Sequence, residues 1–383
     1  MNMLNKTLLK FTFENKRILI LSSQEWGDIF VSKHHYALEL SKKNIIWFLN
    51  SGFRKKLGKF VSVNSVSNNL FIIDYFYLYY GLNKLPFFII KLLNYLISKA
   101  IKKKIGEIDV VLSFEQTRFF NLNLFNAKYK IFLPFDYIPS YPEFEKKVAD
   151  SADIIISVSD EILKNIKSAT PKVKINHGLF IPANNIEIPF VIKMNKEKVN
   201  VAYVGTLNHG HIDRENFLNI VQSNQKCVFH IIGPYNEPKV KNMDYFNFFK
   251  QLSSFNNIYF HGVIDKETLF SVLKSFDIFF TCYDWMNNPI RISNSHKVLE
   301  YLYTGKVTIT NFFSAYKGVP EEILIMPRSN NDIAQIISQV SKNLSYYNSQ
   351  ANMIKRKEFA MQYTYEKNIL RIEQVINERS YDR

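Results

Sequence analysis

Short, largely apolar runs, each followed by a polar turn and a helix-like segment, are the feature that most constrains the fold of this chain. Such runs are typical of strands buried on both faces of a parallel sheet. The pattern occurs in two rounds, which begin with Arg17–Ser22 and Val199–Val204. Because β and α segments alternate in both, the sequence predicts an α/β protein with two parallel sheets and a cleft between them. Ligand sites in such proteins lie at the carboxyl ends of the strands.

Each round contains further segments of the same kind. In the first, we expect a helix at about 32–42 and later strands at 45–49, 70–73, 110–113, 130–133, 154–157 and 173–175. In the second, we expect strands at 227–232, 257–260, 277–281 and 307–310, with helices from about 213, at 266–275 and at 295–303. Prolines and mixed charge predict a linker at 183–198 between an N-terminal domain at 1–182 and a C-terminal domain at 199–362. Residues 363–383 have the apolar spacing of an amphipathic helix.

The composition excludes several classes of protein. The 383 residues are 47% hydrophobic and include only two cysteines, Cys227 and Cys282, so the chain is neither disordered nor built on a disulfide framework. The N-terminus lacks the long apolar stretch of a secretory signal. Two lysines and an asparagine interrupt the most apolar segment, Leu85–Ile101, which is too short to span a membrane. We therefore expect a cytoplasmic protein, soluble or peripheral to the membrane.

Positive charge is concentrated near the N-terminus. The formal net charge is +15, and residues 1–110 hold 17 Lys and Arg against 7 Asp and Glu. Clusters occur at residues 54–56 with Lys59, and at Lys99 with residues 102–104. Lysines beside apolar surface favour an anionic membrane, so we predict peripheral contact with one, with a solvated Lys-rich surface as the alternative. The sequence carries no nucleic-acid-binding motif, and we expect no nucleic-acid partner.

The segment most informative about function is Asn294–Thr310. It predicts a helix that begins near Asn294 or Ser295, residue types that cap helices well. The first N–H groups and the positive end of the helix dipole can hold a diphosphate. Lys297 and Glu300 are three residues apart and share one face. A carboxylate facing the cleft can accept hydrogen bonds from two sugar hydroxyls; alternatively, the two side chains pair on a solvated helix face.

This segment resembles the Asn-Pro-x-Lys-x-x-Glu-Tyr-Leu-Ala-x-Gly-Lys-Pro-Val-Val motif of bacterial GT-B glycosyltransferases, particularly the family 4-like (group 1) enzymes of teichuronic acid and capsular polysaccharide biosynthesis. Other landmarks of that family occur in the right order along nearly the whole chain, at residues 26, 34–40, 152–159, 176–178, 199–205, 231–234, 261–262 and 277–280. The resemblance implies two Rossmann-like, doubly wound domains facing each other across a cleft. It also implies that the last helix packs back on the N-terminal domain.

The resemblance implies roles for residues of the second round. Glu300 would bind the ribose hydroxyls of a nucleotide-sugar donor, and the backbone at Asn294, Ser295 and His296 would hold its diphosphate. The strand ends expected to lie near the donor carry Gly205, Gly233, Pro234, His261, Gly262 and Val263. Tyr283 would touch the donor sugar or simply pack.

The chain departs from the family pattern at three positions. Eight residues before Glu300, where many retaining relatives carry a second glutamate, stands Ile292. An arginine and a lysine of the first donor-domain turn are replaced by Thr206 and His211. The charge of the leaving diphosphate would then be balanced by Lys297, Arg291, Arg214 or His211, and the sequence does not rank them.

The chain contains no Asp-x-Asp sequence, the carboxylate pair by which metal-dependent transferases bridge Mg²⁺ or Mn²⁺ to the diphosphate. We therefore expect no metal and no cofactor; the nucleotide diphosphate sugar is a co-substrate. On the acceptor side, the loop after the first strand holds Glu25, Trp26 and Gly27. The groups that could take the proton of an acceptor hydroxyl are His34, His35 and Asp136, each with a structural role as the alternative.

These features predict a glycosyltransferase that moves a sugar from a nucleotide diphosphate sugar to a hydroxyl of a bacterial surface glycan or its lipid-linked precursor. A sugar-nucleotide epimerase would use the same two-domain plan without an acceptor. A catalytically silent scaffolding subunit is a third hypothesis, because a carboxylate and an arginine of the family pattern are missing.

Overall fold

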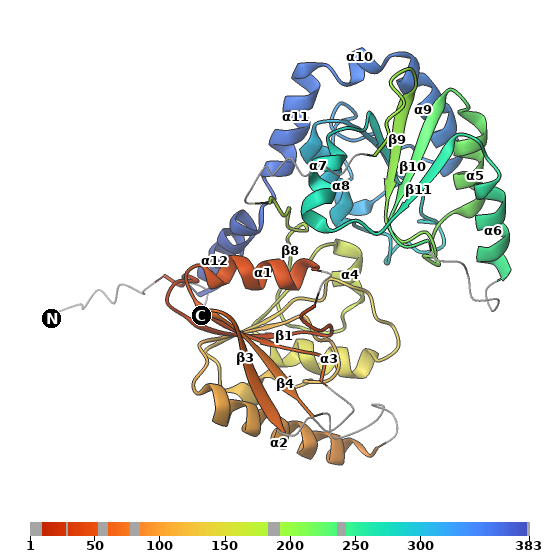
Figure 1. The fold of residues 1–383 in the computed structure, drawn as a ribbon. Helices are drawn as coiled ribbons and strands as arrows, with labels where there is room; N and C mark the ends of the chain where they lie inside the picture. The colour runs from red at the N-terminus through yellow and green to blue at the C-terminus, as the bar shows by residue number, and fades with distance from the viewer. Residues whose placement is uncertain are drawn as a thin grey trace. The chain divides into compact units, whose positions relative to one another are not determined.

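The structure is a computed structural model that describes residues 10–27, 30–52, 60–76, 85–182, 192–235 and 243–380. The chain forms two compact units: unit 1 holds Met1–Asn176 and Tyr365–Arg383, and unit 2 holds His177–Thr364 (Figure 1). Unit 2 thus begins within the range 1–182 expected for the N-terminal domain. Most of the expected linker, residues 183–191, and the basic cluster at residues 54–56 and 59 lie outside the described residues.

Unit 1 contains an eight-stranded sheet with the strand order β3-β4-β2-β1-β5-β6-β7-β8. Its strands are β1 (Arg17–Leu21), β2 (Ile45–Leu49), β3 (Val61–Ser67), β4 (Leu70–Tyr75), β5 (Val110–Ser113), β6 (Tyr129–Phe132), β7 (Ile154–Ser157) and β8 (Lys172–Lys174). Neighbouring strands are parallel except β3 and β4. Strands such as β5 and β7 are buried along their whole length, as their unbroken apolar sequences predict.

The described helices of unit 1 are α1 (Ser32–Ser41), α2 (Phe87–Ile105), α3 (Pro142–Ser151), α4 (Asp160–Asn165) and α12 (Tyr365–Ser380), with a 3₁₀ turn, η1 (Leu122–Phe125). The last helix, α12, packs against the N-terminal strand region and α1. The side chain of Asn377 accepts a hydrogen bond from the Phe11 N–H (2.6 Å) and donates one to the Phe11 carbonyl (2.9 Å). The ring of Tyr365 meets that of Tyr36 on α1, with centroids 5.0 Å apart.

Unit 2 contains a five-stranded parallel sheet with the order β11-β10-β9-β12-β13. Its strands are β9 (Val199–Val204), β10 (Cys227–Ile232), β11 (Ile258–Gly262), β12 (Ile278–Phe280) and β13 (Val307–Ile309). Its helices are α5 (Arg214–Ser223), α6 (Met243–Ser253), α7 (Lys266–Leu273), α8 (His296–Thr304), α9 (Ile333–Lys342), α10 (Leu344–Tyr347) and α11 (Gln350–Met361). Successive residues of a strand enter opposite cores: Tyr203 packs on one face of the sheet and Ala202 and Val204 on the other.

The two predicted parallel sheets are confirmed, and two elements differ from expectation. Strand β3 was not predicted, because its sequence is polar and its second half is exposed; it is the one antiparallel edge of the unit 1 sheet. The apolar segment at residues 85–101 belongs to α2. Within the described ranges, no helix is long and apolar enough to cross a membrane.

Candidate functional site

The carboxyl ends of β9, β10 and β11 are joined through two glycines. The Gly205 N–H donates to the Ile232 carbonyl (2.8 Å), and the Gly233 N–H donates to the Gly262 carbonyl (2.7 Å). Gly205 and Gly233 have φ angles of +152° and +132°, and a Cβ at Gly233 would lie 2.4 Å from the Gly205 carbonyl oxygen. Both positions therefore require glycine. Glycine at these positions lets the turns after β9 and β10 pack directly on each other.

Lys297, in the first turn of α8, brings its ammonium group to this edge of the sheet. Its Nζ donates to the Tyr283 hydroxyl (2.9 Å) and lies 5.6 Å from the centre of the Tyr283 ring. A Cβ built on Gly205 would lie 2.6 Å from this Nζ, which places the charge beside the end of β9. Tyr283 is 5% exposed and its hydroxyl also meets that of Tyr203 at 3.3 Å. The packed tyrosines thus fix the position of the cation.

Arg291 and two histidines lie near Lys297, and of these Arg291 adds positive charge. The rings of His209 and His211 lie 5.2 Å apart, and His209 contacts Tyr283. Burial lowers the pKa of His209, and His211, Lys297 and Arg291 lower it further. Burial and Arg291 also lower the pKa of His211, against the opposing effect of Asp284. The lowered pKa values keep both histidines mainly neutral near pH 7, so Lys297 and Arg291 supply the positive charge that suits this region to an anion.

His209 was not among the residues predicted for the site. It lies in the turn that follows β9, between Gly205 and Gly210, and its position there was the available signal. Thr206, in the same turn, is exposed, and its carbonyl accepts a weak hydrogen bond from the Tyr203 hydroxyl (3.5 Å).

The start of α8 differs from a standard capped helix. Ser295 is the N-cap residue, but its side chain makes no capping hydrogen bond. The Ser295 N–H donates to the Asn294 side-chain oxygen (2.7 Å). The expectation that a Ser or Asn side chain caps this helix was wrong for Ser295. His296, at the first helical position, is exposed. The first turn therefore lacks a cap from Ser295, as a helix end suited to an anionic ligand would.

Glu300 is buried, with 8% of its surface exposed. The Glu300 side chain therefore does not lie on a solvated helix face. Ile292, which stands where family members carry another carboxylate, packs in the main core of unit 2 and is 6% exposed. That position is part of the core here and offers no polar group.

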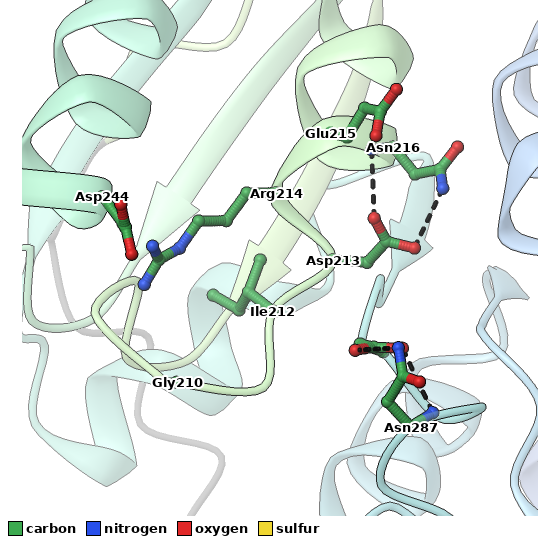
Figure 2. A pocket seen from close by; sticks show the side chains of 9 residues that line it. Gly210, Ile212, Asp213, Arg214, Glu215, Asn216, Asp244 and Asn287 are labelled. Carbon is green, nitrogen blue, oxygen red and sulfur yellow. Dashed lines mark hydrogen bonds between the residues drawn. The ribbon is translucent and has the colours of Figure 1, made fainter.

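Arg214 lies in a separate pocket. A hollow of about 580 Å³ at the start of α5 is lined by Arg214 and by four carboxylates, those of Asp213, Glu215, Asp244 and Asp284. Figure 2 shows the Arg214 side chain extending toward α6, where its guanidinium lies 6.0 Å from the ring centres of Tyr245 and Phe248. Of the four cations that the sequence leaves unranked, Lys297, Arg291 and His211 thus gather together, while Arg214 is surrounded by acidic and aromatic groups.

The remaining donor-side residues lie at the ends of β10 and β11. Pro234 and Val263 are exposed, Val263 to 69%. The His261 ring instead stacks on His230, and its Nε2 lies 3.0 Å from His230 Nδ1. Since Asn200 Oδ1 accepts from His230 Nε2 (3.1 Å), His230 Nδ1 accepts the proton of His261. The His261 side chain thus belongs to a buried network, and its neighbours Gly262 and Val263 form the open edge.

In unit 1, His34 holds the loop after β1 in place. Its Nδ1 accepts from the Val31 N–H (3.1 Å), so its Nε2 is the atom that donates to the Glu25 carbonyl (3.0 Å). His34 is 1% exposed and stacks between Phe30 and Phe48. This geometry favours the structural alternative for His34. His35 is likewise buried, at 3%, and lies against Tyr365 of α12.

The other predicted acceptor-side residues are more accessible. Glu25 and Gly27 are exposed, and Ser51 donates to the Glu25 carboxylate (3.3 Å). The Trp26 N–H donates to the Asn50 side chain (2.7 Å), and its ring packs on aromatic neighbours. Asp136 is exposed at the end of β6. Among the three proposed bases, Asp136 is the one that solvent reaches.

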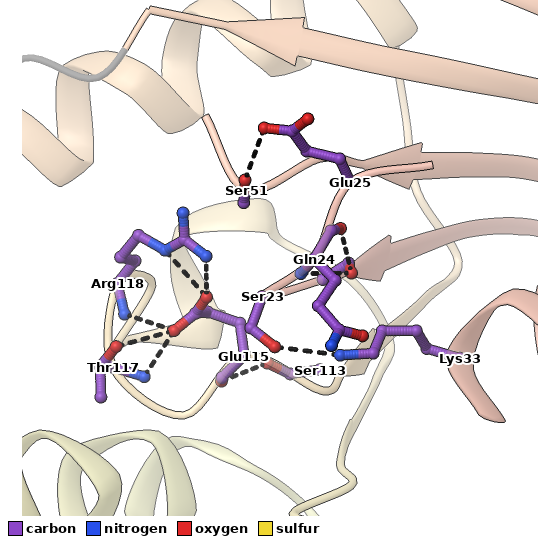
Figure 3. Close-up of polar contacts among 10 residues, drawn as sticks. Ser23, Gln24, Glu25, Lys33, Ser51, Ser113, Glu115, Thr117 and Arg118 are labelled. Atoms are coloured by element: carbon purple, nitrogen blue, oxygen red, sulfur yellow. Dashed lines mark hydrogen bonds and ion pairs between the residues drawn. The ribbon is translucent and has the colours of Figure 1, made fainter. Parts of the chain in front are cut away.

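A charged cluster at the strand ends of unit 1 was not predicted (Figure 3). The Glu115 carboxylate accepts two hydrogen bonds from the Arg118 guanidinium (2.8 and 2.5 Å) and one from the Thr117 hydroxyl (2.8 Å). Burial alone would raise the pKa of Glu115, but these partners hold it below its usual range. Lys33 is 6% exposed and donates to the Ser23 hydroxyl (3.0 Å). Burial lowers the pKa of Lys33, whereas Asp136 and Glu115 oppose that effect.

The fold is shared with known glycosyltransferases, although the sequence is not. No family model matches the chain, and no curated protein matches it. Structures that match include sucrose-phosphate synthase from Thermosynechococcus elongatus, with a TM-score of 0.65, 14% identity and coverage of 96% of this chain and 100% of that chain. An E. coli structure described as trehalose-6-phosphate bound with UDP-2-fluoro glucose matches with a TM-score of 0.68, 10% identity and coverage of 94% and 99%.

A third match is the UDP-forming α,α-trehalose-phosphate synthase from Burkholderia xenovorans in complex with glucose-6-phosphate. Its TM-score is 0.65 at 10% identity, with coverage of 94% of this chain and 100% of that chain. At such identities the likeness concerns the fold. The chain is therefore an α/β protein with two Rossmann-like domains of the GT-B type, the fold of these nucleotide-sugar-dependent glycosyltransferases.

Proposed function

We propose that the protein is a glycosyltransferase that moves a sugar from a nucleotide diphosphate sugar to a hydroxyl acceptor. The observation that carries this proposal is the pair of cations Lys297 and Arg291, which lie beside His209 and His211 at the carboxyl end of the unit 2 sheet. A departing nucleoside diphosphate is strongly anionic, and fixed cations stabilise such charge as it develops. The shared fold with nucleotide-sugar enzymes supports the same function.

In this proposal, the donor is held at the edge formed by β9, β10, β11 and the start of α8. Lys297 and the backbone N–H groups at residues 294–296 contact the diphosphate. The buried Glu300 carboxylate accepts hydrogen bonds from the ribose hydroxyls, and the base lies near Gly262 and Val263. We propose that this chemistry needs no metal, because the chain contains no Asp-x-Asp sequence and cationic side chains can balance the diphosphate.

We propose that unit 1 holds the acceptor, at Glu25, Trp26 and Gly27, and that Asp136 takes the proton of the acceptor hydroxyl. Asp136 is accessible, whereas both ring nitrogens of His34 already bond to the backbone. The acceptor is a growing surface glycan or its lipid-linked precursor. A lipid-linked acceptor would place the enzyme at the inner face of an anionic membrane, in keeping with the excess of positive charge in residues 1–110.

Thermal unfolding of the purified chain with UDP, GDP, CDP and dTDP sugars tests donor binding, because a ligand that binds only the folded state raises the melting temperature. We expect one nucleotide to do so in wild type and to lose much of its effect with Glu300→Gln. Release of free nucleotide diphosphate then establishes transfer or hydrolysis. Conversion of the donor sugar without nucleotide release would indicate an epimerase, and binding without turnover would indicate the scaffolding alternative. Absence of any nucleotide-dependent shift would refute the donor site.

A further inference from the structure

Helix α2 exposes apolar side chains on its outer side, and we call this surface the α2 apolar face. Its exposed fractions lie between 44% and 71%. It consists of Phe87, Phe88, Leu92, Tyr95 and Leu96. Four of these recur at the spacing of one helix side, at positions 88, 92, 95 and 96. This exposure is unusual, because large apolar side chains gathered on an open surface mark an interaction site.

Helix α2 is apolar on both of its sides, unlike an ordinary surface helix. The side that packs on unit 1 carries four buried isoleucines, at positions 90, 97, 101 and 105, together with Asn94 and Ser98. The side chains of Asn94 and Ser98 donate to carbonyls of the same helix, Asn94 to Ile90 (3.0 Å) and Ser98 to Tyr95 (2.9 Å). Packing of the inner side on unit 1 therefore leaves a second apolar side, the α2 apolar face, uncovered.

The α2 apolar face is also hollowed. A pocket of about 410 Å³ lies between it and the η1 segment. Its walls are Phe88, Leu92 and Tyr95 of α2, together with Phe120 and Leu124, and Lys91 also lines it. An apolar chain could enter such a hollow while the lysine meets a polar head.

The positive charge around the α2 apolar face indicates which kind of partner binds it. Residues 87–105 contain five lysines and neither Asp nor Glu, and Lys91, Lys99, Lys103 and Lys104 are exposed. Lys147, from α3, adds its ammonium 5.0 Å from the Phe87 ring. A second copy of this chain on the same surface would bring the same lysines together, which is unfavourable. An anionic lipid surface complements both features, since its headgroups attract lysines and its acyl boundary accepts aromatic and aliphatic side chains.

We propose that the α2 apolar face lies in the boundary between the headgroups and acyl chains of an anionic bilayer, with the neighbouring lysines among the headgroups. The proposal rests on the proposed function, because it supplies the surface by which unit 1 meets a lipid-linked acceptor. The helix lies in the plane of the interface and does not cross the membrane.

Flotation of the full chain with vesicles tests this. We expect binding to phosphatidylcholine vesicles that contain phosphatidylglycerol, weak binding to phosphatidylcholine alone, and release at high salt. The triple variant Phe88→Ser, Leu92→Ser, Leu96→Ser should bind at least tenfold more weakly. Its matched control, Tyr346→Ser, Ile354→Ser, Leu370→Ser, changes three residues of comparable exposure in α10, α11 and α12 and should bind like wild type.

Replacing Lys91, Lys99, Lys103 and Lys104 by Gln should weaken binding to anionic vesicles by at least tenfold, since each surface lysine contributes roughly fivefold. The corresponding control replaces four exposed lysines of unit 2, Lys226, Lys250, Lys342 and Lys357. Tyr95→Trp provides a direct probe, and its added fluorescence should shift to shorter wavelength on anionic vesicles. Equal binding by wild type and both α2 variants would overturn the proposal. So would a dimer that α2 variants dissociate, without any vesicle binding.

The two proposals fail separately. Nucleotide-induced thermal shifts are measured without vesicles, and we expect both α2 variants to retain the wild-type shift and melting temperature. If no nucleotide binds the wild type, the proposed function is wrong, while vesicle binding still reports on the α2 apolar face. If nucleotide binds but vesicles do not, the membrane proposal alone is wrong.

Discussion

The carboxyl ends of the two sheets differ in how their charges are compensated. In unit 1, the buried Glu115 carboxylate is paired with Arg118, and Lys33 lies near Asp136 and Glu115. In unit 2, His209 is subject to the repulsion of further cations, Lys297 and Arg291 among them. Balanced charge holds a loop in shape, whereas accumulated charge of one sign is costly without an anionic ligand. The comparison therefore supports the proposed diphosphate site in unit 2.

The largest expected effect on stability comes from a substitution that breaks the pair of Glu115 and Arg118 in unit 1. Arg118→Met should lower the free energy of unfolding by about 3 kcal/mol, because it leaves the buried Glu115 carboxylate without its partner. Urea unfolding measures this. Adding Glu115→Gln should restore part of the loss, since the double variant buries no unpaired charge. A loss below about 1 kcal/mol for the single variant would mean that solvent already screens the pair, as in a surface ion pair.

The next effect concerns the glycines that shape the unit 2 edge. Gly233→Ala should cost about 2–4 kcal/mol, because it combines a φ of +132° with a Cβ only 2.4 Å from the Gly205 carbonyl oxygen. The matched change in the unit 1 loop is Gly27→Ala, which meets no atom within 4 Å and should be close to neutral. Thermal unfolding of both variants compares them. Equal stability of Gly233→Ala and Gly27→Ala would show that the unit 2 edge requires glycine no more than the unit 1 loop does.

The accumulated charge is tested with Lys297→Met. We expect nucleotide diphosphate to bind about 30-fold more weakly, a loss of roughly 2 kcal/mol typical of a hydrogen bond from a charged group. Isothermal titration calorimetry measures the affinity, and Lys250→Met on the exposed side of α6 is the control. Wild-type affinity in Lys297→Met would remove the main support for the assignment. Arg214→Met should matter less, because Arg214 lies in the carboxylate-lined pocket.

The sequence predicts the fold better than the site, for a physical reason. Strands buried on both faces must be continuously apolar, so β1, β5, β7, β9 and β10 are visible in a local window. The edge strand β3 has no such requirement, since its polar residues face solvent, and it was missed. The exposure of the α2 apolar face was missed for the opposite reason: an apolar run does not reveal which of its sides is exposed.

Whether a residue belongs to a site depends on the direction of its side chain, which the local sequence does not encode. The turn after β9 indicates a ligand edge, yet only the packed Tyr283 shows that Lys297 reaches it. Likewise, the sequence predicts that His261 follows a strand, as a site residue would, but His261 lies within β11 and its ring bonds to buried His230. Lys33 and Glu115 come from distant segments, and the fold alone brings them together. The spacing of Lys297 and Glu300 indicated their shared helix, but not that Glu300 is buried.

The two units should also respond oppositely to acid. Burial raises the pKa of Glu145, on α3 of unit 1, to about 7. The ionised Glu145 carboxylate therefore destabilises the folded state at high pH, and this penalty disappears as pH falls toward 4.5. Burial and His261 lower the pKa of His230 to about 4, so its stabilisation is complete above pH 6.5 and is lost as pH falls toward 4. Each shift corresponds to about 3 kcal/mol across its range, as a penalty at high pH for Glu145 and at low pH for His230.

The free energy of unfolding, measured from pH 7.5 to 4, separates these two effects. Glu145→Gln should remove the increase in this free energy on acidification, and His230→Asn should remove the decrease. His230→Asn also alters packing in β10, which changes stability at every pH. The variants are therefore compared by the slope of the free energy of unfolding against pH. Identical slopes in wild type and both variants would show that neither group titrates differently on folding.

The smallest expected effect on stability comes from removing the N-cap side chains of two helices in unit 2, α5 and α8. Asp213 caps α5, because its carboxylate accepts from the Asn216 N–H (3.2 Å), and it also binds Asn330 (2.8 Å). Asp213→Ala should therefore cost about 1–2 kcal/mol. Ser295→Ala at α8 should cost less than about 0.5 kcal/mol, because the Ser295 hydroxyl makes no capping bond. A loss at Ser295 as large as that at Asp213 would mean that its hydroxyl caps α8 after all, and the helix end would then be satisfied by the protein itself and less suited to a diphosphate.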